Sequence, residues 1–157
     1  CECESGEVRL ARASPRHAVR NKASPKAAAM ASINPQYQQI GEQFTQHYYQ
    51  IFDSNRQGLV ALYNDSSLLT FEGEQFMGAT SIVQKIVSLP FQTVQHQVVK
   101  ADCQPNPSNG GVIVFVTGNL IVDGGAATPL KFAQVFHLAP SGGSFFCQND
   151  MFRLNIG

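Results

Sequence analysis

The side chains of this 157-residue chain that could perform acid–base chemistry are four histidines and a few carboxylates. The spacing of His17, His47, His96 and His137 does not match the pairs that hold a metal ion. His47 lies in a predicted helix, and His96 and His137 lie in predicted strands, where a structural or solvated histidine is the simpler interpretation. We therefore expect no metal site and no cofactor.

Asp150 is a carboxylate with two interpretations. It stands between Asn149 and Met151 in the last predicted strand, where its side chain can point inward. A buried carboxylate must be paired or hydrogen-bonded, so the first interpretation is a member of a structural polar network. The second is a general base with a raised pKa in an apolar pocket, for which Tyr48 and His96 would be the other members of a catalytic trio.

Glu72 and Glu74 flank Gly73 at a predicted hairpin. They are either two solvated turn charges or a charged rim beside the aromatic side chains of Phe71 and Phe76. The sequence contains no G-x-x-x-x-G-K-[ST] phosphate loop, no G-x-G-x-x-G turn, no H-E-x-x-H helix and no G-x-S-x-G elbow. These residues therefore favour a binding function over catalysis.

Three helices must position these side chains from the N-terminal half. Asn34 and Pro35 are typical of a helix start, and apolar residues at three- and four-residue steps predict about five turns that end at Asp53. A second, short helix is predicted over 56–63, and a third is predicted after Gly78, ended by Pro90. The side chains expected to face inward from these helices are Tyr37, Ile40, Phe44, Tyr48, Ile51, Leu59, Val60, Tyr63, Ile82, Val83, Ile86 and Leu89.

Strands dominate the rest of the chain. A short hairpin is predicted over 68–71 and 75–77, followed by four longer strands over 93–103, 112–122, 130–138 and 145–154. Clusters of Gly, Pro, Asn and Ser separate them, including 105–110 and 140–143. The first half of 112–122 is almost entirely apolar, which predicts burial on both faces. In the third long strand, one face is expected to carry Leu130, Phe132, Gln134, Phe136 and Leu138.

Helices followed by an antiparallel meander predict an α+β fold, with the helices on one face of the sheet. The other face then needs a cover of its own. Phe115 and Met151 are candidates for exposed apolar positions on that face, and a large apolar patch usually marks an interface. We therefore expect a homodimer through the sheets.

Charge is unevenly distributed along a chain whose formal net charge is zero. Before Ala31 there are six basic and three acidic residues, a net charge of +3; from Ala31 on there are five and eight, a net charge of −3. A mildly acidic domain argues against nucleic acid as a partner and suits a basic protein. No run of apolar residues approaches the length of a membrane helix, so no membrane insertion is expected. Cys103 and Cys147, isolated in strand patterns, suit a reducing compartment.

Residues 1–29 differ from the rest of the chain, because they are rich in Ala, Arg, Ser and Pro and have little apolar periodicity. A segment of this composition cannot bury enough surface to offset its ordering entropy. We expect a disordered leader over 1–29, with Met30 as the start of a domain that covers 30–157.

Five groups of residues, in this order and spacing, resemble the nuclear transport factor 2 family. They are Gln46–Asp53, Leu69–Gly73, Ile82–Gln92, Gln95–His96 and Asn149–Leu154. The resemblance implies a cone-like fold in which three N-terminal helices pack on a strongly bent, mostly antiparallel sheet, and it implies a homodimer. It also implies a carrier that is not an enzyme, found in the cytoplasm and nucleus and concentrated at the nuclear envelope. The implied partners are the GDP-bound small GTPase Ran, returned to the nucleus, and the phenylalanine–glycine repeats of nucleoporins.

The resemblance also implies roles for individual residues. By position, Phe71 and Phe152 match the walls of an apolar cavity that receives an aromatic side chain of Ran in this family. Glu72 and Asp123 match the acidic rim. A departure follows Asp123, because the loop over 124–128 lacks acidic residues that some members carry. This departure predicts an altered Ran affinity or salt dependence.

Three further residues match binding positions of the family. Tyr37 matches a nucleoporin-repeat contact where members can carry Trp, and packing on its own core is the alternative. Phe115 and Met151 match dimer contacts, and ordinary sheet packing is the alternative. Two other functions stay open for the whole chain: a dehydratase or isomerase on the same fold, and a dimerising scaffold domain.

Overall fold

The computed structural model describes residues 33–155, so the predicted leader lies outside the described residues. The helical elements are α2 (Tyr37–Ser54), the 3-10 helix η1 (Arg56–Leu62) and α3 (Ala79–Val87). The strands are β1 (Leu68–Phe71), β2 (Glu74–Met77), β3 (Val94–Asn106), β4 (Gly111–Val122), β5 (Leu130–Ser141) and β6 (Ser144–Leu154). The predicted order of helices and strands is therefore confirmed.

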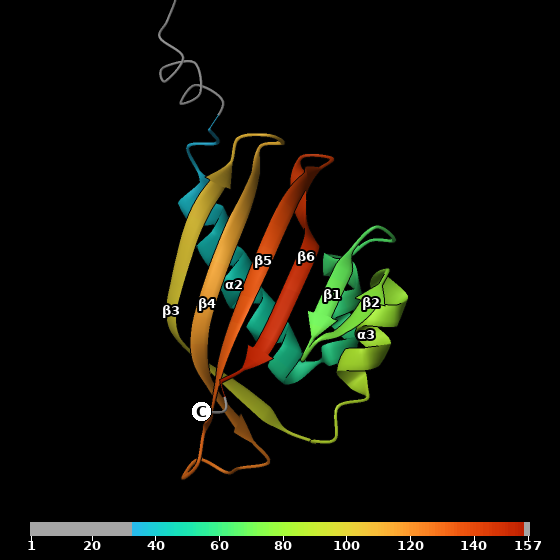
Figure 1. Ribbon diagram of the computed structural model, residues 1–157, viewed down its shortest axis with the longest axis vertical. Coiled ribbons are helices and arrows are strands. Elements are labelled where there is room, and N and C mark those ends of the chain that lie inside the picture. The colour runs from blue at the N-terminus through green and yellow to red at the C-terminus, as the bar shows by residue number, and fades with distance from the viewer. Residues whose placement is uncertain (1–32, 156–157) are drawn as a thin grey trace, which may run out of the picture.

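The six strands form one open, bent sheet in the order β2-β1-β6-β5-β4-β3 (Figure 1). All neighbouring strands are antiparallel except β1 and β6, which run parallel. Helix α2 crosses one face of the sheet behind β3, β4 and β5, while α3 lies beside β2 (Figure 1). The 3-10 helix η1 packs against α2 and α3. The predicted cone-like α+β fold is confirmed. Neither α2 nor α3 combines the length and hydrophobicity that a membrane-crossing helix needs.

Helix α2 supplies most of the aromatic core. The side-chain oxygen of Asn34 accepts a hydrogen bond from the backbone N–H of Gln36 at 2.9 Å, so it satisfies a donor at the helix start, although the helix itself begins at Tyr37. Gly41 lets α2 approach β3 closely, because a Cβ atom there would lie 2.4 Å from the sulfur of Cys103. The buried residues of the helix are Gly41, Phe44, Thr45, Tyr48, Tyr49 and Phe52.

The second helix corrects one prediction about the core. Leu59 and Tyr63 are buried as expected, but the Val60 side chain is exposed. The segment is a 3-10 helix with three residues per turn, so Leu62 and not Val60 lies on the same side as Leu59. Leu62 packs against the core accordingly.

Two strands run further than predicted, through prolines that we had placed in turns. Pro105 is tolerated because β3 lies at the edge of the sheet. Pro140 lies beyond the last pair of β4 with β5, so it has a neighbouring strand on one side only. The β5–β6 turn is reduced to Gly142 and Gly143, whose φ angles of 56° and 81° suit a two-residue hairpin.

The two faces of the sheet differ, which corrects the prediction that the first half of β4 is buried on both sides. Val112, Val114 and Val116 are buried beneath α2, whereas Ile113 and Phe115 are 39% and 44% exposed. The cause is that the helices cover one face only. Met151 on β6 is also exposed, so an apolar surface remains on the open face as predicted.

Candidate functional site: an apolar cavity with a charged rim

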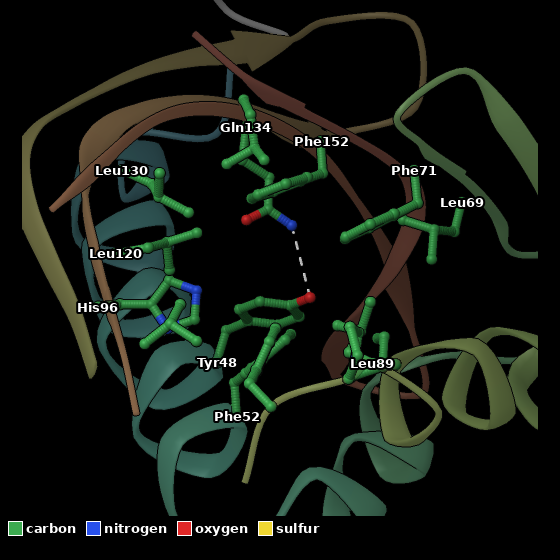
Figure 2. A pocket seen from close by; sticks show the side chains of 15 residues that line it. Tyr48, Phe52, Leu69, Phe71, Leu89, His96, Leu120, Leu130, Gln134 and Phe152 are labelled. Carbon is green, nitrogen blue, oxygen red and sulfur yellow. Dashed lines mark hydrogen bonds between the residues drawn. The ribbon is translucent and has the colours of Figure 1, made fainter. Parts of the chain in front are cut away.

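A cavity of about 270 Å³ lies between the sheet, α2 and α3 (Figure 2). Fifteen residues line it, and three of their side chains, those of Tyr48, His96 and Gln134, carry polar atoms. The apolar remainder comes from α2, β1, β4, β5, β6, α3 and the segment that follows α3. Such a cavity can bind an apolar group of a ligand or partner and so remove that group from contact with water.

One wall of the cavity is a stack of aromatic rings. The rings of Phe71 and Phe152 lie 4.7 Å apart at an interplanar angle of 5°, and Phe132 continues the stack at 5.8 Å from Phe152. The parallel pairing of β1 with β6 places Phe71 directly opposite Phe152. The structure thus brings together two residues that are 81 positions apart and that the family resemblance had matched to the walls of a cavity.

Lys85 on α3 supports this wall from outside. Its ammonium group lies 5.5 Å from the ring centroid of Phe71 and 5.2 Å from that of Phe76, and it forms an ion pair with Glu74 at 2.8 Å. Cation–π contacts of this kind hold a ring in place. Glu74 therefore has a structural partner and is not a freely solvated turn charge.

Glu72 lies directly after Phe71, in a backbone conformation that side-chain-bearing residues rarely adopt. Its φ angle is 50°, and its N–H donates to the carbonyl oxygen of Phe152 at 3.1 Å. One carboxylate oxygen accepts a hydrogen bond from the backbone N–H of Leu154. Leu154 and Phe71 both line the cavity, so this exposed carboxylate is held beside two lining residues.

Asp123 has a similar backbone conformation, with φ at 49°, directly after the cavity residue Val122. One carboxylate oxygen accepts hydrogen bonds from the N–H groups of Gln92 at 2.9 Å and Thr93 at 3.0 Å. These contacts fix the segment between α3 and β3, which runs from the cavity wall to the start of β3. Asp123 is thus an exposed charge that also has a local structural role.

The same segment is also held by Arg56, which sequence reasoning missed. Its guanidinium donates to the carbonyl oxygens of Phe91 at 3.0 Å and Gln92 at 3.1 Å, and it lies 4.4 Å from the ring centroid of Phe91. Arg56 therefore holds the wall residue Phe91 directly, and Asp123 holds the two residues that follow it. No local pattern in the sequence indicates a contact between residues 35 positions apart.

Asp150 lies behind the cavity in a saturated polar network. Its carboxylate accepts hydrogen bonds from the hydroxyl of Tyr63 at 2.7 Å, from that of Tyr48 at 3.3 Å and from the amide of Gln134 at 2.7 Å. The hydroxyl of Tyr49 donates in turn to the carbonyl oxygen of Gln134 at 2.8 Å. The structural interpretation of Asp150 is confirmed, and Tyr63 is a member that sequence reasoning missed.

Burial dominates the electrostatics of this network. It raises the pKa of Asp150 to about 6, although the hydrogen bonds from Gln134, Tyr63 and Tyr48 each act to lower it. Burial, together with the charge of Asp150, also raises the pKa values of Tyr48, Tyr49 and Tyr63 well above 10. The three phenols therefore remain protonated donors at neutral pH.

His96 lies on another side of the cavity and pairs with Asp53, not with Asp150. Its Nδ1 lies 2.5 Å from one carboxylate oxygen of Asp53, and its backbone N–H donates to the other at 2.9 Å. The imidazole stacks on Tyr49 at 4.5 Å and contacts the edge of Phe52. The three residues of the possible catalytic trio thus do not converge as one unit.

The remaining predicted residues lie away from this cavity. Tyr37 is half-buried at the start of α2, where it packs against the core. Phe115 and Met151 line a shallow groove on the open face of the sheet, together with Val135. No group of three metal-ligating side chains occurs among residues 33–155.

Comparison with known proteins identifies relatives over most of the domain. A family model described as the nuclear transport factor 2 (NTF2) domain matches residues 40–154. Nuclear transport factor 2 of Oryza sativa subsp. japonica is 52% identical over 118 residues, which are 75% of this chain and 96% of that protein. The same factor of Saccharomyces cerevisiae is 50% identical over 116 residues, which are 74% and 92% of the two chains. These relatives are named as transport factors, not as enzymes.

Solved structures agree with the sequence comparison. Nuclear transport factor 2 from Cryptosporidium parvum has a TM-score of 0.74 and 56% identity, covering 78% of this chain and 98% of that one. A putative scytalone dehydratase from Novosphingobium aromaticivorans reaches a TM-score of 0.64 at 12% identity, covering 76% of this chain and 84% of its own, which shows a shared fold alone. By its family match, its identity to these relatives and its fold, the chain belongs to the nuclear transport factor 2 family.

Proposed function

We propose that this protein is a nuclear import carrier that binds GDP-bound Ran and phenylalanine–glycine repeat nucleoporins and returns Ran to the nucleus. The observation that carries the proposal is the apolar cavity with an aromatic wall, in which the exposed carboxylates of Glu72 and Asp123 directly follow the lining residues Phe71 and Val122 in the chain. A cavity of roughly 150 Å³ can bind benzene, so about 270 Å³ suits one aromatic side chain of a partner. The carrier would be found in the cytoplasm and nucleus, concentrated at the nuclear envelope.

The charge around the mouth supports a basic partner surface. Glu72 and Asp123 are exposed, and the domain from Ala31 on has a net charge of −3. Rim charges of this kind mainly orient the partner and speed association, while a buried aromatic anchor contributes most of the affinity. Phe71 and Phe152 are therefore proposed as the anchor contacts, and Glu72 and Asp123 as the orienting contacts.

The first experiment is calorimetry of the full chain with Ran loaded separately with GDP and with a GTP analogue. We expect binding to the GDP form alone, and we expect Glu72→Lys to abolish it because a repulsive charge replaces an attractive one. Asp65→Lys is the matched control, since it makes the same charge change at an exposed loop residue that does not line the cavity. Binding to neither form, or full binding by the Glu72 variant, would contradict the proposal.

Asp123 allows its two proposed contributions to be separated. Asp123→Asn removes the charge but keeps an oxygen for the N–H groups of Gln92 and Thr93, whereas Asp123→Ala removes both. We expect Ran binding to weaken with Asn and to weaken further with Ala, because Ala also loosens the segment that carries Phe91. If the two variants bind Ran equally, Asp123 contributes to binding through its charge and not through its hydrogen bonds to the segment.

The repeat contact and the homodimer are proposed on the other surfaces of the domain. Tyr37 keeps part of its ring accessible, which a repeat phenylalanine could cover. Phe115 and Met151, 44% and 52% exposed on the open sheet face, are apolar positions that a second copy would bury. Sedimentation should show a dimer at micromolar concentration and more monomer with Phe115→Glu. Tyr37→Ala should weaken binding to a phenylalanine–glycine peptide while Ran binding persists.

A further inference from the structure

His96 presents an unused polar atom to the cavity. Its side chain is 2% exposed, and Nδ1 is occupied by the Asp53 carboxylate. The hydrogen bonds of His96 within residues 33–155 are made by Nδ1 and by its backbone N–H, both to Asp53, and none involves Nε2. Figure 2 shows the labelled imidazole at the cavity wall with a ring nitrogen directed toward the interior.

The partner of Nδ1 determines what Nε2 can do. A carboxylate only accepts hydrogen bonds, so Nδ1 carries the proton in its contact with Asp53. In the neutral ring Nε2 is then an acceptor with a free lone pair. The pairing with Asp53 thus directs one acceptor into the cavity.

The other polar side chains of the cavity wall are already engaged in hydrogen bonds. The hydroxyl of Tyr48 donates to Asp150 and lies 3.4 Å from the amide nitrogen of Gln134. That amide also donates to Asp150, and its oxygen accepts from Tyr49. Among the polar side-chain atoms that line the cavity within residues 33–155, Nε2 of His96 is the one without a hydrogen bond, and its surroundings are apolar.

We infer that the cavity is a binding site for a small, neutral, single-ring aromatic molecule that carries one hydrogen-bond donor, of which phenol is the simplest example. The ring occupies the apolar volume beside Phe71 and Phe152, and the hydroxyl donates to Nε2 of His96. This site uses the same cavity as the proposed Ran contact but does not depend on Ran binding.

The test compares phenol with toluene, which replaces the hydroxyl by a methyl group of similar size. Each is titrated at pH 8 into the full chain labelled with nitrogen-15. We expect both to shift the amide resonances of cavity residues, with phenol binding about five-fold more tightly because of one net hydrogen bond. Phenol, and not toluene, should also shift the Nε2 resonance of His96.

The matched variant is His96→Phe, which keeps an aromatic ring and removes the acceptor. In this variant toluene should bind at least as tightly as phenol. The Nε2 resonance of the unaltered chain gives an independent readout if the variant folds poorly. Equal affinities for phenol and toluene in the unaltered chain, or no binding of either, would overturn the inference, and because Ran is absent these outcomes are separate from those that test the carrier.

Discussion

Asp150 lies behind the cavity and His96 lies in its wall, and both side chains are buried. They differ in how many of their polar atoms form hydrogen bonds. Three donors occupy the Asp150 carboxylate, whereas His96 is held through one ring nitrogen and leaves the other without a partner. Burial alone would have suggested similar roles. The difference teaches that a saturated polar group specifies the fold, while an unsaturated one beside a void is available to a ligand.

The largest effect is expected on the Asp150 side. Asp150→Ala leaves the hydroxyls of Tyr48 and Tyr63 and the amide of Gln134 without their shared acceptor, and breaking such a buried network costs about 3–5 kcal/mol. Urea unfolding should show this loss as a lower midpoint. A loss below about 1 kcal/mol would mean that Asp150 contributes no more to the stability of the fold than is expected of His96.

A pH dependence should follow from the same carboxyl group. Its pKa is about 6 in the folded state against 3.8 as the ordinary value, so the folded state binds the proton more tightly. The stabilisation is therefore fully present below about pH 3.8 and is lost as the pH rises through about 6, a change of roughly 3 kcal/mol. The unfolding free energy of the unaltered chain should therefore decrease between pH 4 and 7.5 more than that of Asp150→Asn. If the two curves of unfolding free energy against pH are parallel, the prediction is contradicted.

A smaller effect is expected for Tyr63→Phe. The variant keeps the ring in the core and removes the shortest tyrosine hydrogen bond to Asp150, at 2.7 Å. The cost should be about 1–2 kcal/mol, because Tyr48 and Gln134 still occupy the carboxylate. Thermal unfolding measures it. A cost as large as that of Asp150→Ala would mean that Tyr63 alone satisfies the carboxylate.

The smallest effect on stability is expected on the other side, for His96→Phe. Asp53 keeps the backbone N–H of residue 96 as a partner, and its side chain is 25% exposed, so water can replace the lost ring contact. A loss of at most about 1 kcal/mol is expected in the same urea experiment. A loss above 3 kcal/mol would show that His96 serves the fold as much as Asp150 does.

Much of this molecule could be predicted from local patterns. Helix α2, the short hairpin and the four long strands follow from apolar periodicity, and the inward position of Gln134 follows from alternation along β5. The resemblance added Phe71 and Phe152 as cavity-wall residues, and the structure shows that they lie opposite one another. The burial error at Val60 arose because the segment is a 3-10 helix with a period of three residues, and the error at Ile113 arose because apolar character does not specify which face of a strand the helices cover.

The contacts that complete the site could not be predicted. Tyr63 and Asp150 are 87 positions apart, Asp53 and His96 are 43, and Arg56 and Phe91 are 35. Each pair is a single polar contact that depends on the final packing of two elements and leaves no repeat in the sequence. Which atoms stay unpaired, Nε2 of His96 among them, is a property of the assembled structure alone.

Strand β6 has a consequence for how the protein is made. It contributes Asp150 to the buried network and Phe152 and Leu154 to the cavity, and its parallel partner β1 lies some 80 residues earlier in the chain. During synthesis, the helices and the β3–β4 hairpin can form from local contacts as they emerge, but the cavity cannot close until residues 144–154 have left the ribosome. A nascent chain therefore exposes its aromatic wall to chaperones until the last strand is in place.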